Sequence, residues 1–242
     1  MSVVRPPARS LSPIARVGRE MFFDARLSGS GAVSCATCHD PARAYGPPPQ
    51  LKLPGFDEAA QGDPVRAIPS LRYSDRTPPF AIGPDREDAS GPVAATMPAS
   101  VPPRKIAEMP TSTPLVPRGG LFWDGRADSF EEQAVSPLMN PVEMANANAA
   151  AVSDKLRHFG YAARLATVTA VPLTTAPGQP SVLDEALFAV ARFEAEDPSF
   201  HPYSSRYDRW LEGRETLTAA ELRGLRVFED PSKGNCAACH LD

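Results

Sequence analysis

The chain has 242 residues, of which 42% are hydrophobic and 22% are charged, and its formal net charge is −4. This length fits one large domain or two small ones, and the composition is that of a globular protein. The small negative charge gives no reason to expect nucleic-acid binding, and no apolar run approaches the length of a membrane span. Residues 1–12 show neither the apolar region nor the cleavage site of an export signal.

The first expected element is a short helix over residues 13–24. Ser12 precedes it as a plausible N-cap, and Pro13 stands in the first turn, where proline is tolerated. An apolar face at helical spacing supports the helix, formed by Ile14, Val17, Met21 and Phe22. A loop rich in serine and glycine then follows over residues 26–31.

That loop leads into the sequence Cys35-Ala36-Thr37-Cys38-His39. Two cysteines separated by two residues and followed by histidine form the attachment signature of a c-type haem, in which the histidine binds the iron. A zinc half-site or a redox dithiol is the alternative, and each would need further ligands or a thioredoxin-like setting.

Residues 46–118 differ in composition, because they hold 16 of the 28 prolines. Proline removes backbone donors and restricts the preceding residue, so neither a helix nor a central strand is expected here. We predict an ordered irregular wrap over residues 64–84, which carry scattered apolar side chains, and a looser tip over residues 85–112.

The second half of the chain is expected to be helical, with a linker between Pro198 and Pro202. Ser129 and Thr218 open sequences of the capping-box form, and Ser181 is a good N-cap. The expected helices cover residues 130–136, ending before Pro137, and 146–159, 161–168, 182–195, 204–211 and 219–228. The helix over 182–195 has an apolar stripe of Leu183, Leu187, Val190 and Phe193.

The pattern recurs at the end of the chain as Cys236-Ala237-Ala238-Cys239-His240. The two motifs use all four cysteines and two of the four histidines, which favours covalent haem at both sites over a metal site or a disulfide. A helix and a polar turn precede each motif, which is a weak internal repeat. Because no alternating apolar strand appears, the expected fold is all-α.

Three residues between the motifs, Trp123, Gln133 and Glu143, are spaced ten apart. A peroxide-cleaving haem needs an acid–base group, and a carboxyl beside an apolar porphyrin would hold its proton more firmly. An amide can hold peroxide in place, and an indole can relay electrons. From the residue types alone, a solvated glutamate and a core tryptophan remain the alternative.

The chain resembles the bacterial dihaem cytochrome c peroxidase family, which includes MauG-type enzymes. The resemblance extends over about residues 12–240, apart from the proline-rich insert. It is carried by residues 18–28, Cys35 to Pro41, Phe122 to Ala127, Glu132 to Ala134, Pro137-Leu138, Asn140-Pro141, Glu143-Met144 and residues 206–213, and by the helix entering the second motif.

This resemblance implies two cytochrome c-like haem domains with long irregular loops. The first, over 10–198 with the insert 46–118, would hold the peroxidatic haem through Cys35, Cys38 and His39. The second, beginning in 199–242, would hold the electron-transfer haem through Cys236, Cys239 and His240. Trp123 would lie between the haems, with Gln133 and Glu143 at the peroxide site.

The resemblance also implies partners and a location. The substrate would be hydrogen peroxide, and the electron donor a small cytochrome c or cupredoxin, in the periplasm. A calcium site between the haems and a homodimer are left open. A MauG-type enzyme that oxidises a protein substrate is one alternative function, and a dihaem electron-transfer protein without peroxide chemistry is another.

Two departures from the family pattern lead to further expectations. Many members have a histidine that caps the resting peroxidatic iron, but no histidine lies between His39 and His158. We therefore expect the first haem to be open, with Met97 or Met109 as alternative ligands. The sixth ligand of the second haem, a Met or a Tyr in the family, is expected beyond Asp242, which leaves the second domain incomplete. His158 and His201 are expected to be a surface and a structural residue.

Overall fold

The computed structural model describes residues 3–5, 7, 9–49, 51, 66–84, 115–173 and 180–238. The chain divides into two compact units. The larger unit comprises Pro7–Phe80 and Gly119–Pro202, and the smaller comprises Met1–Pro6, Ala81–Arg118 and Tyr203–Asp242. Within the described part of the chain, no helix combines the length and apolar character needed to cross a membrane. The predicted loose tip at 85–112 lies outside the described residues.

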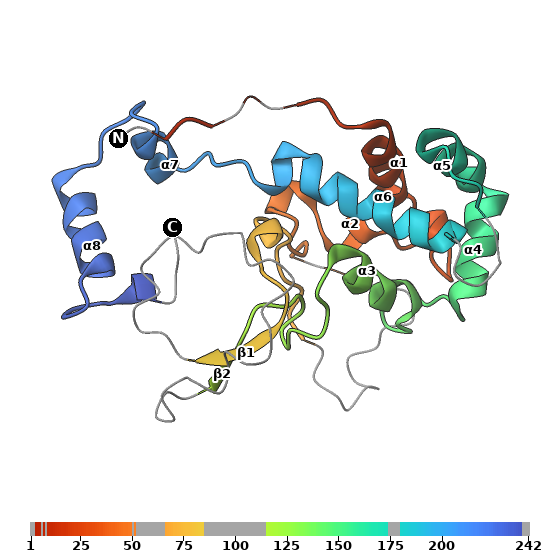
Figure 1. Ribbon diagram of the computed structural model, residues 1–242, viewed down its shortest axis with the longest axis horizontal. Helices are drawn as coiled ribbons and strands as arrows, with labels where there is room; N and C mark the ends of the chain where they lie inside the picture. Colours follow the sequence, from red (N-terminus) through yellow and green to blue (C-terminus); the bar gives the residue numbers. More distant parts are fainter. Residues whose placement is uncertain are drawn as a thin grey trace, which may run out of the picture. The chain divides into compact units, whose positions relative to one another are not determined.

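The larger unit is helical (Figure 1). Its α-helices are α1 (Pro13–Phe23), α2 (Cys35–Cys38), α3 (Phe130–Met139), α4 (Ala149–His158), α5 (Tyr161–Thr169) and α6 (Val182–Glu196). Local signals set several of the boundaries. The hydroxyl of Ser12 accepts the Ala15 amide at 3.2 Å, and Ser181 and Asp184 form a reciprocal capping box at the start of α6. The prediction that this part of the chain is mainly helical is confirmed.

Helices α1 and α6 pack side by side (Figure 1) and form the centre of this unit. Their backbones meet at Gly18, where an added Cβ would lie 1.8 Å from the carbonyl oxygen of Ala189. Glycine permits this approach because it has no side chain. The main core cluster combines residues of α1, α4, α5 and α6 with the segment before the first motif, and its largest members include Met21, Met144, Leu156, Tyr161 and Leu165.

A second core cluster is aromatic. Phe22 of α1 and Phe193 of α6 meet Tyr45 and Phe200, and each of these four side chains is at most 2% exposed. The rings of Tyr45 and Phe200 stack with centroids 3.8 Å apart, and the remaining contacts are edge-to-face. This cluster ties the segment after the first motif to the end of α6.

Helix α3 corrects one predicted boundary. The helix was expected to end before Pro137, but it continues through that residue to Met139. Proline has no amide to bond the carbonyl of Gln133, four residues earlier. The next turn still forms because the Asn140 amide donates to the Ser136 carbonyl at 2.9 Å. A single missing hydrogen bond is therefore tolerated near the C-terminus of this helix.

The smaller unit contains a short two-stranded antiparallel sheet that the sequence did not predict. Strand β1 (Ala81–Pro84) pairs antiparallel with β2 (Leu115–Arg118), with Ala81 opposite Arg118 and Pro84 opposite Leu115. Among the described residues the sheet has two strands, so both are edge strands. Proline is tolerated in edge strands, where a missing backbone donor need not interrupt the hydrogen bonds between strands. The expectation of an irregular segment up to residue 84 was therefore wrong at its end.

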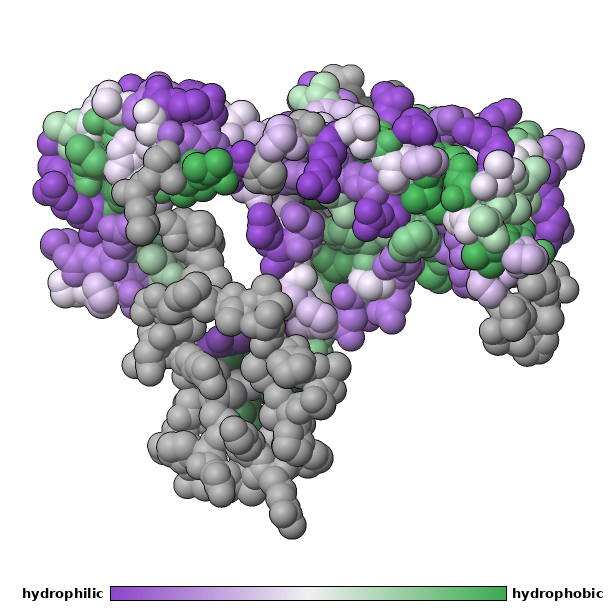
Figure 2. All heavy atoms as spheres, turned by 45° about the horizontal axis from the view of Figure 1, so that its top comes forward, coloured by the Kyte–Doolittle hydropathy of each residue, from purple (hydrophilic) through white to green (hydrophobic). Residues whose placement is uncertain are grey.

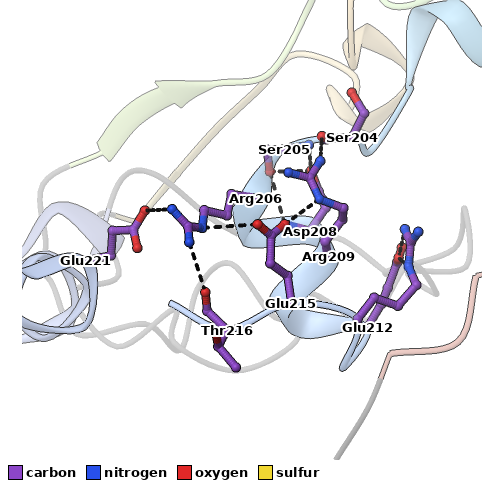
Figure 3. A network of polar contacts seen from close by, with 10 residues as sticks. Ser204, Ser205, Arg206, Asp208, Arg209, Glu212, Glu215, Thr216 and Glu221 are labelled. Carbon is purple, nitrogen blue, oxygen red and sulfur yellow. Dashed lines mark hydrogen bonds and ion pairs between the residues drawn. The ribbon is translucent and has the colours of Figure 1, made fainter. Parts of the chain in front are cut away.

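The rest of the smaller unit consists of α7 (Arg206–Leu211), α8 (Ala219–Glu229) and the 3₁₀ turn η6 (Cys236–Ala238). Figure 3 shows how α7 is joined to the segment that leads into α8. Arg209 donates to Glu215 at 2.5 Å, and Arg206 lies 3.3 Å from both Glu215 and Glu221. Ionic contacts therefore link α7 to α8 and to the segment between them, and neither helix has a fully buried residue.

The exterior of the helical unit is mostly polar on the face drawn in Figure 2. In the view of Figure 2, hydrophilic residues occupy most of the visible face of this unit, and smaller apolar areas lie between them. Exposed single apolar side chains are normal on a folded protein. The feature that stands out is in the interior, where an apolar cavity opens beside the first motif.

Candidate functional site

An apolar cavity lies within the larger unit. Most of its wall is formed by aliphatic and aromatic side chains of α1, α3, α4 and α6. Its polar and reactive wall residues include Cys35, Cys38, His39, Gln133, Glu143 and Glu194. Small-molecule and cofactor sites are typically lined by apolar side chains with a few polar groups among them. The first motif therefore lines an apolar cavity whose wall has the composition of a cofactor site.

The two thiols of the motif are placed by α2, a single helical turn. The amide of Ser34 donates to Thr37 Oγ1 at 2.9 Å, which closes that turn. Burial in the cavity wall raises the pKa of Cys35 to about 12 and that of Cys38 to about 11. Both are therefore neutral thiols near neutral pH, and both face the same cavity.

The imidazole of His39 is held in one tautomer. Its Nδ1 lies 2.8 Å from the carbonyl oxygen of Tyr45. Because a carbonyl only accepts hydrogen bonds, Nδ1 carries the proton and Nε2 is left unprotonated. Burial lowers the pKa of His39, which favours the neutral ring needed for metal ligation.

A tight turn and a locked ring place that carbonyl. Ala44 and Tyr45 both have positive φ, of 57° and 59°, which turns the chain back toward His39. The Tyr45 hydroxyl lies 2.5 Å from Ser199 Oγ, and its ring stacks on Phe200. Two thiols, a neutral imidazole and an apolar cavity thus fit a c-type haem at this site.

Gln133 and Glu143 reach the cavity from α3 and from the turn that follows it. Asn140, the C-cap of α3, donates its side-chain amide to Glu143 Oε1 at 2.6 Å. Burial nevertheless raises the pKa of Glu143 above the ordinary glutamate value, against the effects of Asn140 and the more distant Arg126. The Glu143 carboxyl therefore holds its proton more firmly than an ordinary glutamate does.

Trp123 does not line the cavity. Its side chain is 65% exposed, and its indole nitrogen donates to the carbonyl oxygen of Ala67 at 2.7 Å. Phe122 before it has a φ of 66°, and the Arg126 guanidinium lies 3.7 Å from the centre of the Phe122 ring. The structure thus brings Gln133 and Glu143 together but leaves Trp123 on the surface of its unit.

The second motif is described in part. Cys236 lies in η6, and its sulfur is 3.6 Å from the carbonyl oxygen of Gly234. Asn235 adopts a φ of 48° in the turn that joins α8 to this motif. Cys239 and His240 lie outside the described residues, as do Met97 and Met109. Within the described part, no group of three or more His, Cys, Asp or Glu side chains is arranged to hold a metal ion.

The other two histidines can be placed. His158 is exposed in the last turn of α4, as expected of a surface residue. His201 is partly buried after the 3₁₀ turn η5 (Pro198–Phe200), in the segment predicted as a linker. Neither residue lines the cavity, so among the described histidines His39 alone does.

Sequence reasoning missed Glu194. This residue lies on α6, lines the cavity and is 8% exposed. The cavity-facing positions of α6 are Leu183, Ala186, Leu187 and Val190, and residue 194 is the next at helical spacing. A glutamate where the apolar stripe calls for another apolar residue was the available signal.

Comparisons with known proteins show to which family the chain is similar. The chain is 34% identical over 234 residues to the methylamine utilization protein MauG of Paracoccus denitrificans, an alignment that covers 94% of this chain and 51% of the relative. It is 27% identical over 243 residues to the cytochrome c551 peroxidase of Nitrosomonas europaea, covering 97% and 54%. The chain thus spans about half the length of these curated relatives.

The chain is also similar to a solved structure. The fold is similar to that of the diheme peroxidase BthA from Burkholderia thailandensis, with a TM-score of 0.66, 32% identity, and coverage of 99% of this chain and 52% of that one. The family model described as di-haem cytochrome c peroxidase matches residues 12–216. This chain therefore belongs to the di-haem cytochrome c peroxidase family.

Proposed function

We propose that this chain is part of a peroxidase that reduces hydrogen peroxide to water with electrons from a small cytochrome c or cupredoxin. One observation carries the proposal. Glu143 and Gln133 line the same apolar cavity as the two thiols and the imidazole of the first motif. An electron-transfer haem without peroxide chemistry has no need of a buried acid–base group at this place.

The first haem would be held by thioether bonds to Cys35 and Cys38, with His39 Nε2 on the iron. The second would be held in the same way by Cys236, Cys239 and His240. When bound, the first haem supplies an iron that binds peroxide and passes it two electrons. The remaining steps belong to the protein side chains, and the net reaction consumes two protons and forms two waters.

Glu143 is assigned the proton transfers. A carboxylate at this position accepts a proton from the near oxygen of peroxide and, as the acid, returns it to the oxygen that leaves as water. Its raised pKa keeps the proton available at the moment of cleavage. The amide of Gln133 donates a hydrogen bond that holds peroxide beside Glu143.

The assignment extends to the rest of the chain. Residues 10–198 are proposed as the peroxidatic domain, and residues 199–242 as the start of an electron-transfer domain. The change of compact unit at Tyr203 supports a boundary near this point, although the compact units place residues 81–118 with the smaller unit. Trp123, whose ring is exposed on its own unit, is proposed to relay electrons between the haems. A periplasmic location follows from covalent haem attachment outside the cytoplasm.

A MauG-type activity is the second candidate. It is favoured by the 34% identity to the MauG protein of Paracoccus denitrificans. Such an enzyme would use the same cavity to oxidise a protein substrate in place of a small electron donor. The two activities differ in whether a reduced cytochrome or cupredoxin supports continuous peroxide consumption.

Steady-state kinetics of the haem-loaded protein test the proposal. Peroxide consumption would be measured with reduced cytochrome c or cupredoxin for the wild type, Glu143→Gln and Glu132→Gln. Loss of the acid–base group should lower kcat by about 10²–10⁴-fold. Glu132 is exposed on α3, so its variant should keep the wild-type rate. Equal rates for all three proteins would reject the proposal, and oxidation of a protein substrate without donor turnover would favour the MauG-type activity.

A further inference from the structure

Glu194 is a buried carboxyl in the haem cavity that the peroxide mechanism does not use. It is 8% exposed and stands one turn after Val190 on the cavity-facing side of α6. Among the described residues, this carboxyl accepts no hydrogen bond and forms no ion pair, and its oxygens are not sealed off from the cavity. It is therefore a polar group without a partner in a wall that is otherwise mainly apolar.

The surroundings of Glu194 can be described element by element. Helices α1 and α4 contribute apolar side chains to the cavity, namely Met21, Phe22, Val152 and Leu156. The charged or titratable groups that act on or share the cavity with Glu194 are Glu131 of α3, Cys35, Cys38, His39 and Glu143. None of these supplies a positive charge while His39 is neutral.

Such surroundings favour the protonated carboxyl. Removing a carboxylate from water without a compensating partner is costly, and the nearby carboxylate of Glu131 adds repulsion. Burial, followed by Glu131, raises the pKa of Glu194 to about 8. The protonation of a buried carboxyl with such a pKa responds readily to a change of charge in the same cavity.

We propose that Glu194 is a proton-uptake site coupled to the first haem: it binds a proton when that haem is reduced and releases the proton when it is oxidised. The inference rests on the proposed binding of haem by Cys35, Cys38 and His39. One electron from the donor protein converts ferric to ferrous iron, and one proton from solvent converts the carboxylate to the acid. The charge within the cavity then stays constant, which a low dielectric favours.

Thermodynamic linkage fixes the sign of the coupling. The added electron makes the carboxylate less favourable, so the pKa of Glu194 is higher when the haem is reduced than when it is oxidised. Between these two values, reduction takes up a proton, and the midpoint potential of the haem must fall as pH rises. Below the lower value and above the higher one, Glu194 contributes no slope.

Spectroelectrochemical titration of the haem-loaded protein across about pH 6 to 10 tests this inference. The wild-type potential of the first haem should fall with rising pH within this interval. In Glu194→Gln the midpoint potential should no longer fall with rising pH within this interval. Glu131→Gln removes the repelling charge, so it should keep the fall but shift it to lower pH. Glu143→Gln removes the other cavity carboxyl and should leave the fall in place.

The outcomes separate this inference from the proposed function. A wild-type slope retained in Glu194→Gln, or one lost in Glu143→Gln, would overturn the role of Glu194. If Glu194→Gln did not fold, an unshifted titration in Glu131→Gln would overturn it. Peroxide consumption is measured separately, so the slope can be assigned to Glu194 in a protein that fails to turn over peroxide. Absence of haem at Cys35 and Cys38 would overturn both proposals.

Discussion

The imidazole Nδ1 of His39 lies 2.8 Å from the carbonyl oxygen of Tyr45, and the hydroxyl at the other end of Tyr45 lies 2.5 Å from Ser199 Oγ. One residue thus links the proposed iron ligand to the segment after α6. Its ring is 2% exposed and packs within the aromatic cluster. The tautomer of His39 is therefore set by a carbonyl whose position depends on packing some 150 residues away in sequence.

Truncation of the Tyr45 side chain should destabilise the protein. Tyr45→Ala removes a fully packed ring and is expected to lower the free energy of unfolding by about 3–5 kcal/mol. Phe23→Ala is the matched control, because Phe23 contacts the same cluster but is 43% exposed. Urea unfolding followed by circular dichroism measures both losses. Equal losses would show that Tyr45 is not a central member of the cluster.

The close approach of α1 and α6 makes Gly18 intolerant of any side chain. Gly18→Ala places a Cβ 1.8 Å from the Ala189 carbonyl oxygen, so the helices must separate. We expect a loss of about 1–3 kcal/mol or more, in spite of the higher helix propensity of alanine. Gly224 lies in α8 with no atom within 4 Å of an added Cβ. Gly224→Ala should therefore stabilise α8 by up to about 1 kcal/mol, and thermal unfolding of both variants checks the opposite signs.

Asp24 should make the free energy of unfolding depend on pH in the acidic range. Its carboxylate accepts two hydrogen bonds from Arg26, at 2.6 and 2.8 Å, and one from the Tyr161 hydroxyl at 2.8 Å. The Arg26 bonds are the main cause that lowers the pKa of Asp24 below its ordinary value of 3.8. The stabilisation is therefore fully present above that ordinary value, and it is lost as pH falls through the lower pKa of the folded state.

Acid titration of the unfolding free energy measures this effect. The wild type should lose stability more steeply below about pH 4 than Asp24→Asn, which has no charge to lose. Asp154→Asn is the control, because the Asp154 side chain is 78% exposed and forms one surface ion pair with Arg157. An acid slope in Asp24→Asn equal to that of the wild type would contradict the assignment.

Features encoded by neighbouring residues could be predicted from the sequence. The caps at Ser12, Ser181 and Thr218 use side chains three residues apart or closer, and the structure places helices at all three. Gln133 and Glu143 were found because the family motifs around them are dense. In both cases the information is local, so a single sequence contains it.

Features that depend on distant contacts could not be predicted. The pairing of β1 with β2 joins segments about 30 residues apart that contain prolines. Tyr45 acquires its role through Ser199 and Phe200, which no local pattern connects to it. Glu194 was missed because a glutamate on a helix is usually exposed to solvent, although its position on the apolar stripe of α6 indicated that it faces inward.

The first haem is expected to be open in the oxidised protein. Of the described histidines, His39 alone lines the cavity, and no histidine lies between it and His158 in the sequence. The absorption and electron paramagnetic resonance spectra of the oxidised, haem-loaded protein should therefore contain a high-spin ferric signal. Purely six-coordinate low-spin iron would mean that another residue caps the first haem.

The central claim is that Glu143 performs acid–base chemistry on peroxide in the cavity of the first motif. Rapid mixing of the reduced, haem-loaded protein with a stoichiometric amount of peroxide measures that step without the electron donor. We expect haem oxidation in Glu143→Gln to be slower by about 10²–10⁴-fold than in the wild type, with unchanged haem content. Oxidation of the Glu143→Gln protein at the wild-type rate would contradict the claim.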